Sequence, residues 1–167
     1  LCNGINIKDI ARLKYQNIDR EAITFVRAKT ERKLRKNQKS IVVPVTTEIK
    51  AIIKRWGNKP ANKDSYVFPI LTGIITPERE RALVQQATKN TNKYIKRIAA
   101  ELKINKPVTT YTARHSFATV MKRSGASIEF ISESLGHSNL ATTENYLASF
   151  EMETKRKFAK NLLKFQK

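Results

Sequence analysis

Three residues in the C-terminal part of the chain could together act on a phosphate ester. They are Arg114 in "TARHSFAT", His137 in "LGHS" and Tyr146 in "TTENY". The planar guanidinium of an arginine can bind two phosphate oxygens at once. A tyrosine hydroxyl is a poor nucleophile at neutral pH because it is protonated there. Against a phosphodiester that arginine and histidine hold, it can nevertheless attack phosphorus and form a covalent ester.

Each of these residues also has an ordinary structural interpretation. Arg114 could form a salt bridge, and Tyr146 could pack at the end of a helix. What favours chemistry is the order of four features along the chain: R-H-S-F-A-T in a helical segment, an S-G-A turn, L-G-H-S, and T-T-x-x-Y.

The composition favours a polyanionic partner. The 167 residues are enough for one domain with a core, and 33 lysines and arginines oppose 14 acids, for a formal net charge of +19. Nucleic acid is the main interpretation, and an anionic membrane surface is the minor one. Cys2 is the single cysteine, so an intramolecular disulfide is excluded. One cysteine and two histidines cannot supply the usual four zinc ligands, and no apolar run is long enough to span a bilayer.

The pattern of apolar residues predicts a mainly helical α+β fold with a small antiparallel sheet near the N-terminus. The two strands fall within 22–30 and 39–46, with a basic hairpin connection between them, and a third short strand or extended run covers 66–71. Helices are expected at 6–15, 47–56, 77–102, 109–122, 127–135, 138–147 and 151–165. Within the fourth helix, Phe117, Val120 and Met121 are expected to face inward.

The same motifs resemble the tyrosine recombinases, the phage-integrase family. "YTARHSFAT" and "LGHSNLATTENY" are similar to the family's H-x-x-R-H-[ST]-F-A-T, L-G-H and T-x-x-Y motifs. "NGINIKDIARLKYQNID" and "RAKTERKLRKNQKSIVVPV" are similar to its opening helix and its β-hairpin. The resemblance implies a tyrosine-recombinase-like catalytic domain that cuts and rejoins double-stranded DNA. It also implies a reaction that needs no metal and no other cofactor.

The resemblance also assigns the main catalytic roles. Tyr146 would be the nucleophile that forms a 3′-phosphotyrosyl link. Arg114 and His137 would bind the scissile phosphate where negative charge develops. Lys29, in "RAKT", would be the general acid that protonates the leaving 5′-hydroxyl.

Two positions depart from the family pattern, and two others follow it in support roles. Asn6 stands where the family has an arginine, so one phosphate-binding cation is missing. Tyr111 stands where the family has a histidine, although its hydroxyl can still donate a hydrogen bond. His115 would orient the site from behind Arg114. Asp9 matches the acidic position of the first helix.

Arg27 is a candidate for the missing cation. On a strand, residues i and i+2 point to the same side, so Arg27 would emerge on the same face as Lys29. The alternative is that Arg27 contacts flanking DNA backbone. Four further basic residues of the hairpin connection are expected to lie on DNA: Arg32, Lys33, Arg35 and Lys36.

The resemblance extends to organisation and partners. Residues 1–167 would form the catalytic domain, with a core-binding domain preceding it in the whole protein. Residues 151–167 would form a helix that packs on its own domain or on a neighbouring protomer. The expected assembly is a homotetramer on DNA, with accessory DNA-bending proteins, in the bacterial cytoplasm at the nucleoid and not at a membrane.

Three other functions stay open at this point. The chain could be a DNA-binding relic that lost catalysis through the change at Asn6. It could be a type IB topoisomerase-like enzyme, which shares the chemistry but relaxes DNA without a partner site. A basic structural or RNA-binding protein would explain the charge but not the ordered motifs.

Overall fold

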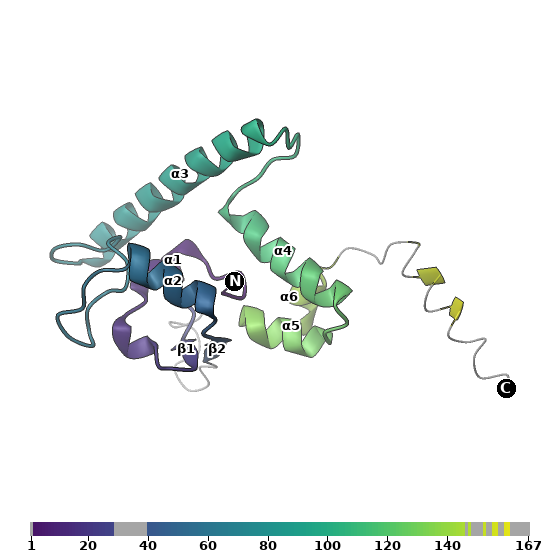
Figure 1. The fold of residues 1–167 in the computed structure, drawn as a ribbon, viewed down its shortest axis with the longest axis horizontal. Coiled ribbons are helices and arrows are strands. Elements are labelled where there is room, and N and C mark those ends of the chain that lie inside the picture. The colour runs from purple at the N-terminus through teal and green to yellow at the C-terminus, as the bar shows by residue number, and fades with distance from the viewer. Residues whose placement is uncertain are drawn as a thin grey trace.

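The fold is mainly helical, with one two-stranded antiparallel sheet (Figure 1). It is known from a computed structural model, which describes residues 2–28, 40–145 and 147 and a few positions between 152 and 160. The predicted fold class is therefore confirmed.

The N-terminal half is built around the sheet. Helix α1 (Ile7–Arg12) and the short 3-10 helix η1 (Tyr15–Asn17) lead into strand β1 (Ala22–Phe25). This strand pairs antiparallel with β2 (Ile41–Pro44). Burial alternates along both strands, as expected for a sheet with one face on the core. The first core cluster consists of Leu13, Ile23, Phe25, Ile41, Val43, Ile49 and Val67.

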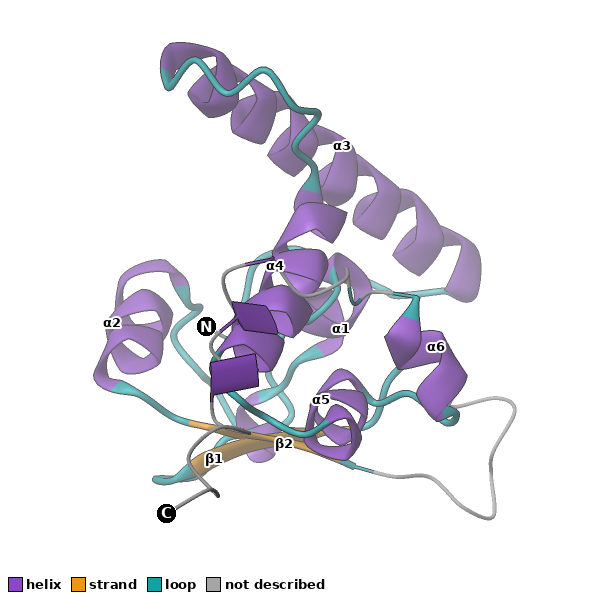
Figure 2. Ribbon diagram, turned by 90° about the vertical axis from the view of Figure 1, so that its right-hand side faces the viewer, coloured by secondary structure: helices purple, strands orange, loops and turns teal. Residues whose placement is uncertain are grey.

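Helix α2 (Thr47–Trp56) follows β2 and supplies Ile49 to this core. It begins where the hydroxyl of Thr46 accepts a hydrogen bond from the Ile49 amide, at 3.4 Å. It ends before Gly57, as the sequence predicts. In Figure 2, α2 and α5 lie on the same side of the sheet.

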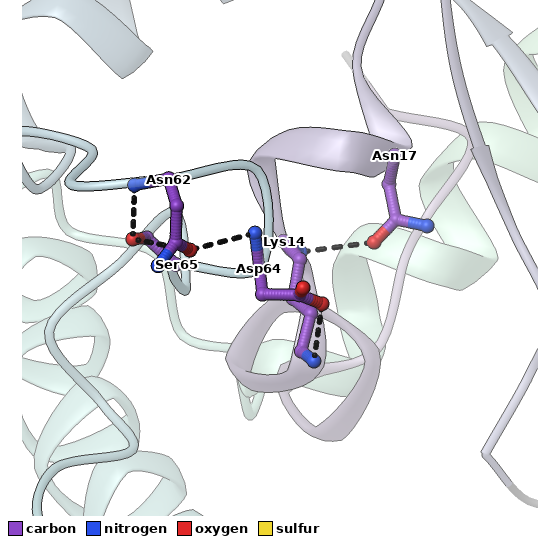
Figure 3. A network of polar contacts seen from close by, with 5 residues as sticks. All are labelled: Lys14, Asn17, Asn62, Asp64 and Ser65. Atoms are coloured by element: carbon purple, nitrogen blue, oxygen red, sulfur yellow. Dashed lines mark hydrogen bonds and ion pairs between the residues drawn. The ribbon is translucent and has the colours of Figure 1, made fainter.

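The loop after α2 is fastened to the segment after α1 by polar contacts (Figure 3). The Lys14 ammonium lies 3.2 Å from a carboxylate oxygen of Asp64. The Asn62 side chain accepts from the Asp64 amide at 2.9 Å. The expected strand at 66–71 is only an isolated bridge between Lys14 and Tyr66, although Val67 and Leu71 in this run are buried.

Helix α3 (Pro77–Glu101) is the longest element, and Figure 1 shows it rising away from the sheet. Pro77 opens it, and the Thr76 hydroxyl accepts from the Arg79 amide at 3.2 Å. The sequence predicts one continuous apolar face, but Tyr94, Ile98 and Leu102 at the far end are exposed. The beginning of α3 packs beside α1, where Glu80 lies 3.4 Å from the Lys8 ammonium, while its far end projects away from the sheet (Figure 2).

The C-terminal half is a second cluster of helices. Helix α4 (Thr110–Arg123) and helix α5 (Ile128–Leu135) pack around Ala118, Ile131 and Leu135, and helix α6 (Leu140–Glu144) contacts α5. Helix α5 also contacts β2, which joins this cluster to the sheet.

The expectation that Val120 faces inward is wrong, because its side chain is 53% exposed. Successive helical residues are about 100° apart, so Val120 lies nearly opposite the fully buried Ala118. Phe117 and Met121 do pack against the second cluster, as predicted.

Two expected segments lie outside the described residues: the hairpin connection at 29–39 and most of the last helix at 151–165. The helix predicted at 138–147 is α6, which begins at Leu140 and ends at Glu144. In the described part of the chain, every helix is too short or too polar to cross a bilayer.

Candidate active site

The site is organised by a sharp corner at the end of α5. Gly136 has φ 62° and ψ 41°, the left-handed conformation in which glycine is favoured. The amide of the next residue, His137, donates to the Ser132 carbonyl at 2.9 Å and closes the helix. The chain therefore reverses at Gly136 and presents His137 directly after the last turn of α5.

Close packing makes a side chain at Gly136 impossible without movement. A Cβ there would lie 2.5 Å from Cδ1 of Ile41 on β2 and 2.7 Å from Cδ of Arg27. The turn at Gly136 therefore packs directly against Ile41 of β2 and against Arg27.

Arg114 joins three segments at this corner. It is 3% exposed, on the buried face of α4. Its Nη1 donates to the Gly4 carbonyl at 3.1 Å, and its Nη2 donates to the Leu135 carbonyl. Nη2 also lies 3.1 Å from Nε2 of His137. The arginine and histidine that the sequence separates by 23 positions are therefore in direct contact.

Only glycine fits at position 4, because the backbone of Arg114 packs directly against it. Gly4 has φ +60°, and a Cβ on it would lie 2.7 Å from Cα of Arg114. The N-terminal turn thereby packs directly on the backbone of α4 and supplies a carbonyl to the guanidinium.

The second ring nitrogen of His137 faces α6. Nδ1 lies 2.9 Å from Oγ1 of Thr143, whose side chain is fully buried. Thr143 lies on α6, three residues before Tyr146. His137 therefore contacts the helix that precedes the expected nucleophile. Sequence reasoning did not single out Thr143 or Gly136, although both lie inside the motifs it used.

Arg27 reaches the same corner from the end of β1. It is 9% exposed, and its Nη1 donates to the Gly136 carbonyl at 3.1 Å. Arg27 and Arg114 therefore bind consecutive carbonyls, those of Gly136 and Leu135. This places a second buried cation at Gly136, the residue before His137.

Asp9 is buried on α1, and its carboxylate accepts from the Ala28 amide at 2.9 Å. The contact fixes the backbone immediately before Lys29. At the start of the same helix, the Asn6 carbonyl accepts from the Ile10 amide at 3.0 Å.

Tyr111 and His115 lie on α4 close to Arg114 but at the surface, unlike the buried guanidinium. Both side chains are exposed, and their rings meet edge to face with centroids 4.9 Å apart. The remaining predicted site residues fall outside the described part of the chain: Lys29, Arg32, Lys33, Arg35, Lys36 and Tyr146.

Comparison with known proteins identifies the family. The model of the phage integrase family matches residues 1–153. The chain belongs to this family. Among solved structures, the XerA recombinase aligns with a TM-score of 0.64 and 21% identity, over 95% of this chain and 54% of that one. The Tn1549 transposon integrase in complex with a circular intermediate DNA aligns with a TM-score of 0.60 and 18% identity, over 96% of this chain and 55% of that one. These two matches show that the chain shares its fold with part of each of these proteins.

Curated relatives in the family are tyrosine recombinases. XerC of Xanthomonas axonopodis pv. citri is 29% identical over 146 residues, which cover 86% of this chain and 42% of that protein. XerA of Thermococcus kodakarensis is 28% identical over 144 residues, which cover 86% of this chain and 46% of that protein. The chain thus spans less than half the length of these two relatives.

Proposed function

We propose that this chain is the catalytic domain of a tyrosine site-specific recombinase that cuts and rejoins double-stranded DNA. The observation that carries the proposal is the direct contact between Arg114 and His137 beside α6, the helix that precedes Tyr146. Membership of the phage integrase family supports it, as do relatives named tyrosine recombinases. The formal charge of +19 suits a DNA partner.

The proposed reaction is a transesterification. The Tyr146 hydroxyl loses its proton to water as its oxygen attacks the scissile phosphorus, the phosphotyrosyl bond forms, and the bond to the 5′-oxygen breaks. Lys29 gives its proton to that leaving oxygen, while Arg114 and His137 bind the non-bridging oxygens. Because the phosphotyrosine retains an ester bond, a 5′-hydroxyl of another strand can reverse the step. The outcome is strand exchange and not hydrolysis.

Arg27 is proposed as the cation that replaces the arginine missing at Asn6. Its guanidinium is already at the corner, 3.1 Å from the Gly136 carbonyl, and a guanidinium carries five N–H donors. A group with this many donors can hold the corner and also contribute a hydrogen bond to a phosphate oxygen.

Arg27→Ala tests this role. The expected result is a loss of strand cleavage of about 100-fold or more, as for the removal of one oxyanion-binding donor, with DNA binding retained. Arg27→Lys keeps the positive charge but loses the planar guanidinium with its paired donors, so it should recover part of the cleavage rate. Preserved cleavage in Arg27→Ala, with binding intact, would rule the role out.

The partners follow from the same proposal. Double-stranded DNA would lie along the basic segment that holds Arg32, Lys33, Arg35 and Lys36. The active assembly would be a homotetramer on DNA, aided by accessory DNA-bending proteins, in the bacterial cytoplasm at the nucleoid. His115 and Asp9 would support the site, and Tyr111 would add a donor near the phosphate.

Covalent trapping tests the whole proposal. The protein is incubated with nicked DNA duplexes of random sequence around the nick, where cleavage releases a short strand and leaves the enzyme attached. SDS-resistant adducts that are present in the wild type and absent in Tyr146→Phe are the expected result, and sequencing them gives the site. DNA binding without any adduct would instead support a DNA-binding protein that has lost catalysis, because Asn6 stands where the family has an arginine.

A further inference from the structure

The geometry points to Thr143 as a positioning residue that lets His137 change tautomer when a phosphate binds. This inference rests on the proposed function, in which His137 donates a hydrogen bond to the scissile phosphate. It concerns the hydroxyl group of Thr143 and both nitrogens of the His137 ring.

Without phosphate, the contacts fix one tautomer. A guanidinium has donors and no acceptor, so Nε2 of His137 must accept from Arg114 Nη2, 3.1 Å away. A neutral ring then carries its proton on Nδ1. That proton points to Oγ1 of Thr143 at 2.9 Å, which accepts it.

With a phosphate in the site, the requirement is reversed. Phosphate oxygens are acceptors, so His137 needs a proton on Nε2 in order to bind one. A neutral ring that takes this tautomer has a lone pair on Nδ1. The hydroxyl of Thr143 can rotate and donate to that lone pair, because a hydroxyl both donates and accepts. Thr143 therefore satisfies both forms of the ring without any movement of α6.

The surroundings of Thr143 favour this role over a general structural one. Its side chain has no solvent exposure, so water cannot replace the hydroxyl. It lies on α6, whose N-terminus is capped by the Asn139 side chain at 2.9 Å from the Ala141 amide. The adjacent Thr142 is exposed on the same helix and provides a matched control.

The tautomer can be read directly, because the chain has only two histidines. The wild-type protein is labelled with ¹⁵N-histidine, and comparison with His115→Gln is used only to assign which ring signals belong to His137. Long-range ¹H–¹⁵N spectra should show the proton on Nδ1 alone in the free protein. Inorganic phosphate, added until the signals stop moving, should shift the proton to Nε2. A proton on Nε2 in the free protein, a doubly protonated ring with phosphate, or an unchanged tautomer would overturn the inference.

Cleavage of the nicked duplexes gives a second measurement. Thr143→Val keeps the shape of the side chain and removes the hydroxyl. Cleavage should fall roughly 10- to 100-fold, by analogy with the loss of outer-shell partners that orient metal-bound histidines. Thr143→Ser should restore the rate, and Thr142→Val should leave it unchanged. Wild-type cleavage by Thr143→Val would overturn the role.

Failure of the two proposals can be told apart. If the wild type forms no adduct, the recombinase proposal fails, while the phosphate titration still decides the tautomer of His137. If Thr143→Val has a lower melting temperature than the wild type, its loss of cleavage could reflect misfolding. The inference is then tested by cleavage in Thr143→Ser and by the ¹H–¹⁵N spectra of the His137 ring.

Discussion

Arg27 and Arg114 donate hydrogen bonds to two consecutive backbone carbonyls at the C-terminal end of α5. The last carbonyls of a helix lack partners within the helix and carry partial negative charge, so buried cations there are stabilising. One arginine comes from the end of β1 and the other from α4. The corner that bears His137 is therefore held jointly by the sheet and by the C-terminal helices.

Replacing Gly136 by alanine should damage both stability and activity. At φ +62° an alanine costs roughly 1–2 kcal/mol in backbone strain. The added Cβ also overlaps Ile41 and Arg27, so the total loss in unfolding free energy should exceed that range. Urea unfolding measures the loss, and adduct formation should fall with it.

Gly125→Ala is the matched control for Gly136→Ala. Gly125 has φ +87°, but a Cβ there would meet nothing within 4 Å. It should show the strain alone and leave adduct formation intact. Equal losses of stability in the two variants would show that the corner has room to relax.

Asp9 should matter through its position next to Lys29. Asp9→Ala leaves the Ala28 amide without its acceptor, which should cost about 1–3 kcal/mol of unfolding free energy. Asp9→Asn retains an oxygen acceptor and should cost less. Both are measured by urea unfolding, together with the rate of adduct formation.

A purely catalytic role for the Asp9 charge would give a different result. In that case Asp9→Asn would keep its stability and lose cleavage as fully as Asp9→Ala. Recovery of both properties in Asp9→Asn is the outcome that the hydrogen bond to Ala28 predicts.

The sequence predicts local elements well because their signals are local. Thr76 with Pro77 marks the start of α3, and Ser127 caps α5 through the Phe130 amide at 3.2 Å. The two strands predicted within 22–30 and 39–46 are likewise found, as β1 and β2. The exposed end of α3 was not predictable, because periodicity shows which face is apolar but not whether another element covers it.

The site was predictable in its residue types and not in its connections. The motifs identify Arg114 and His137. Arg27 was expected on a strand, but β1 ends at Phe25, so it reaches the corner from beyond the strand. No sequence pattern shows that Arg114 binds the Gly4 carbonyl or that Nδ1 of His137 meets Thr143. Those contacts depend on how the N-terminal turn and α6 pack, which is a property of the tertiary structure.

Asp19 should contribute to the loss of stability in acid. Its carboxylate accepts from the amides of Ala22 and Glu21, each at 2.7 Å, and these bonds lower the pKa of Asp19 below its ordinary value of 3.8. Below that value the unfolded chain takes up the proton first, so stability falls as the pH drops toward the lower pKa of the folded state. The contribution is fully present at higher pH.

Asp19→Asn tests this by keeping an oxygen acceptor that does not titrate. Urea unfolding of both proteins at a series of acidic pH values should give a shallower decline for the variant. Parallel curves would show that other carboxylates account for the acid sensitivity.

The segment 29–39 should set the salt dependence of DNA binding. Each phosphate that a lysine or arginine neutralises contributes about 0.9 to the slope of log K against log salt concentration. Replacing Arg32, Lys33 and Arg35 together by glutamine should therefore lower the magnitude of the slope by up to about 2.7 if all three contact phosphates. Fluorescence anisotropy with a labelled duplex over a salt series measures the slope.

A control variant loses the same three positive charges on another part of the surface. Lys50, Lys54 and Lys59 are exposed on α2 and just after it, and their replacement by glutamine also removes three of the formal charges of +19. Net charge alone would lower the slope equally in both variants, because it acts wherever the charges lie. A contact surface at 29–39 lowers it only in the first variant. If both triple variants lower the slope by the same amount, the contact surface at 29–39 is rejected and general charge attraction is the basis of binding.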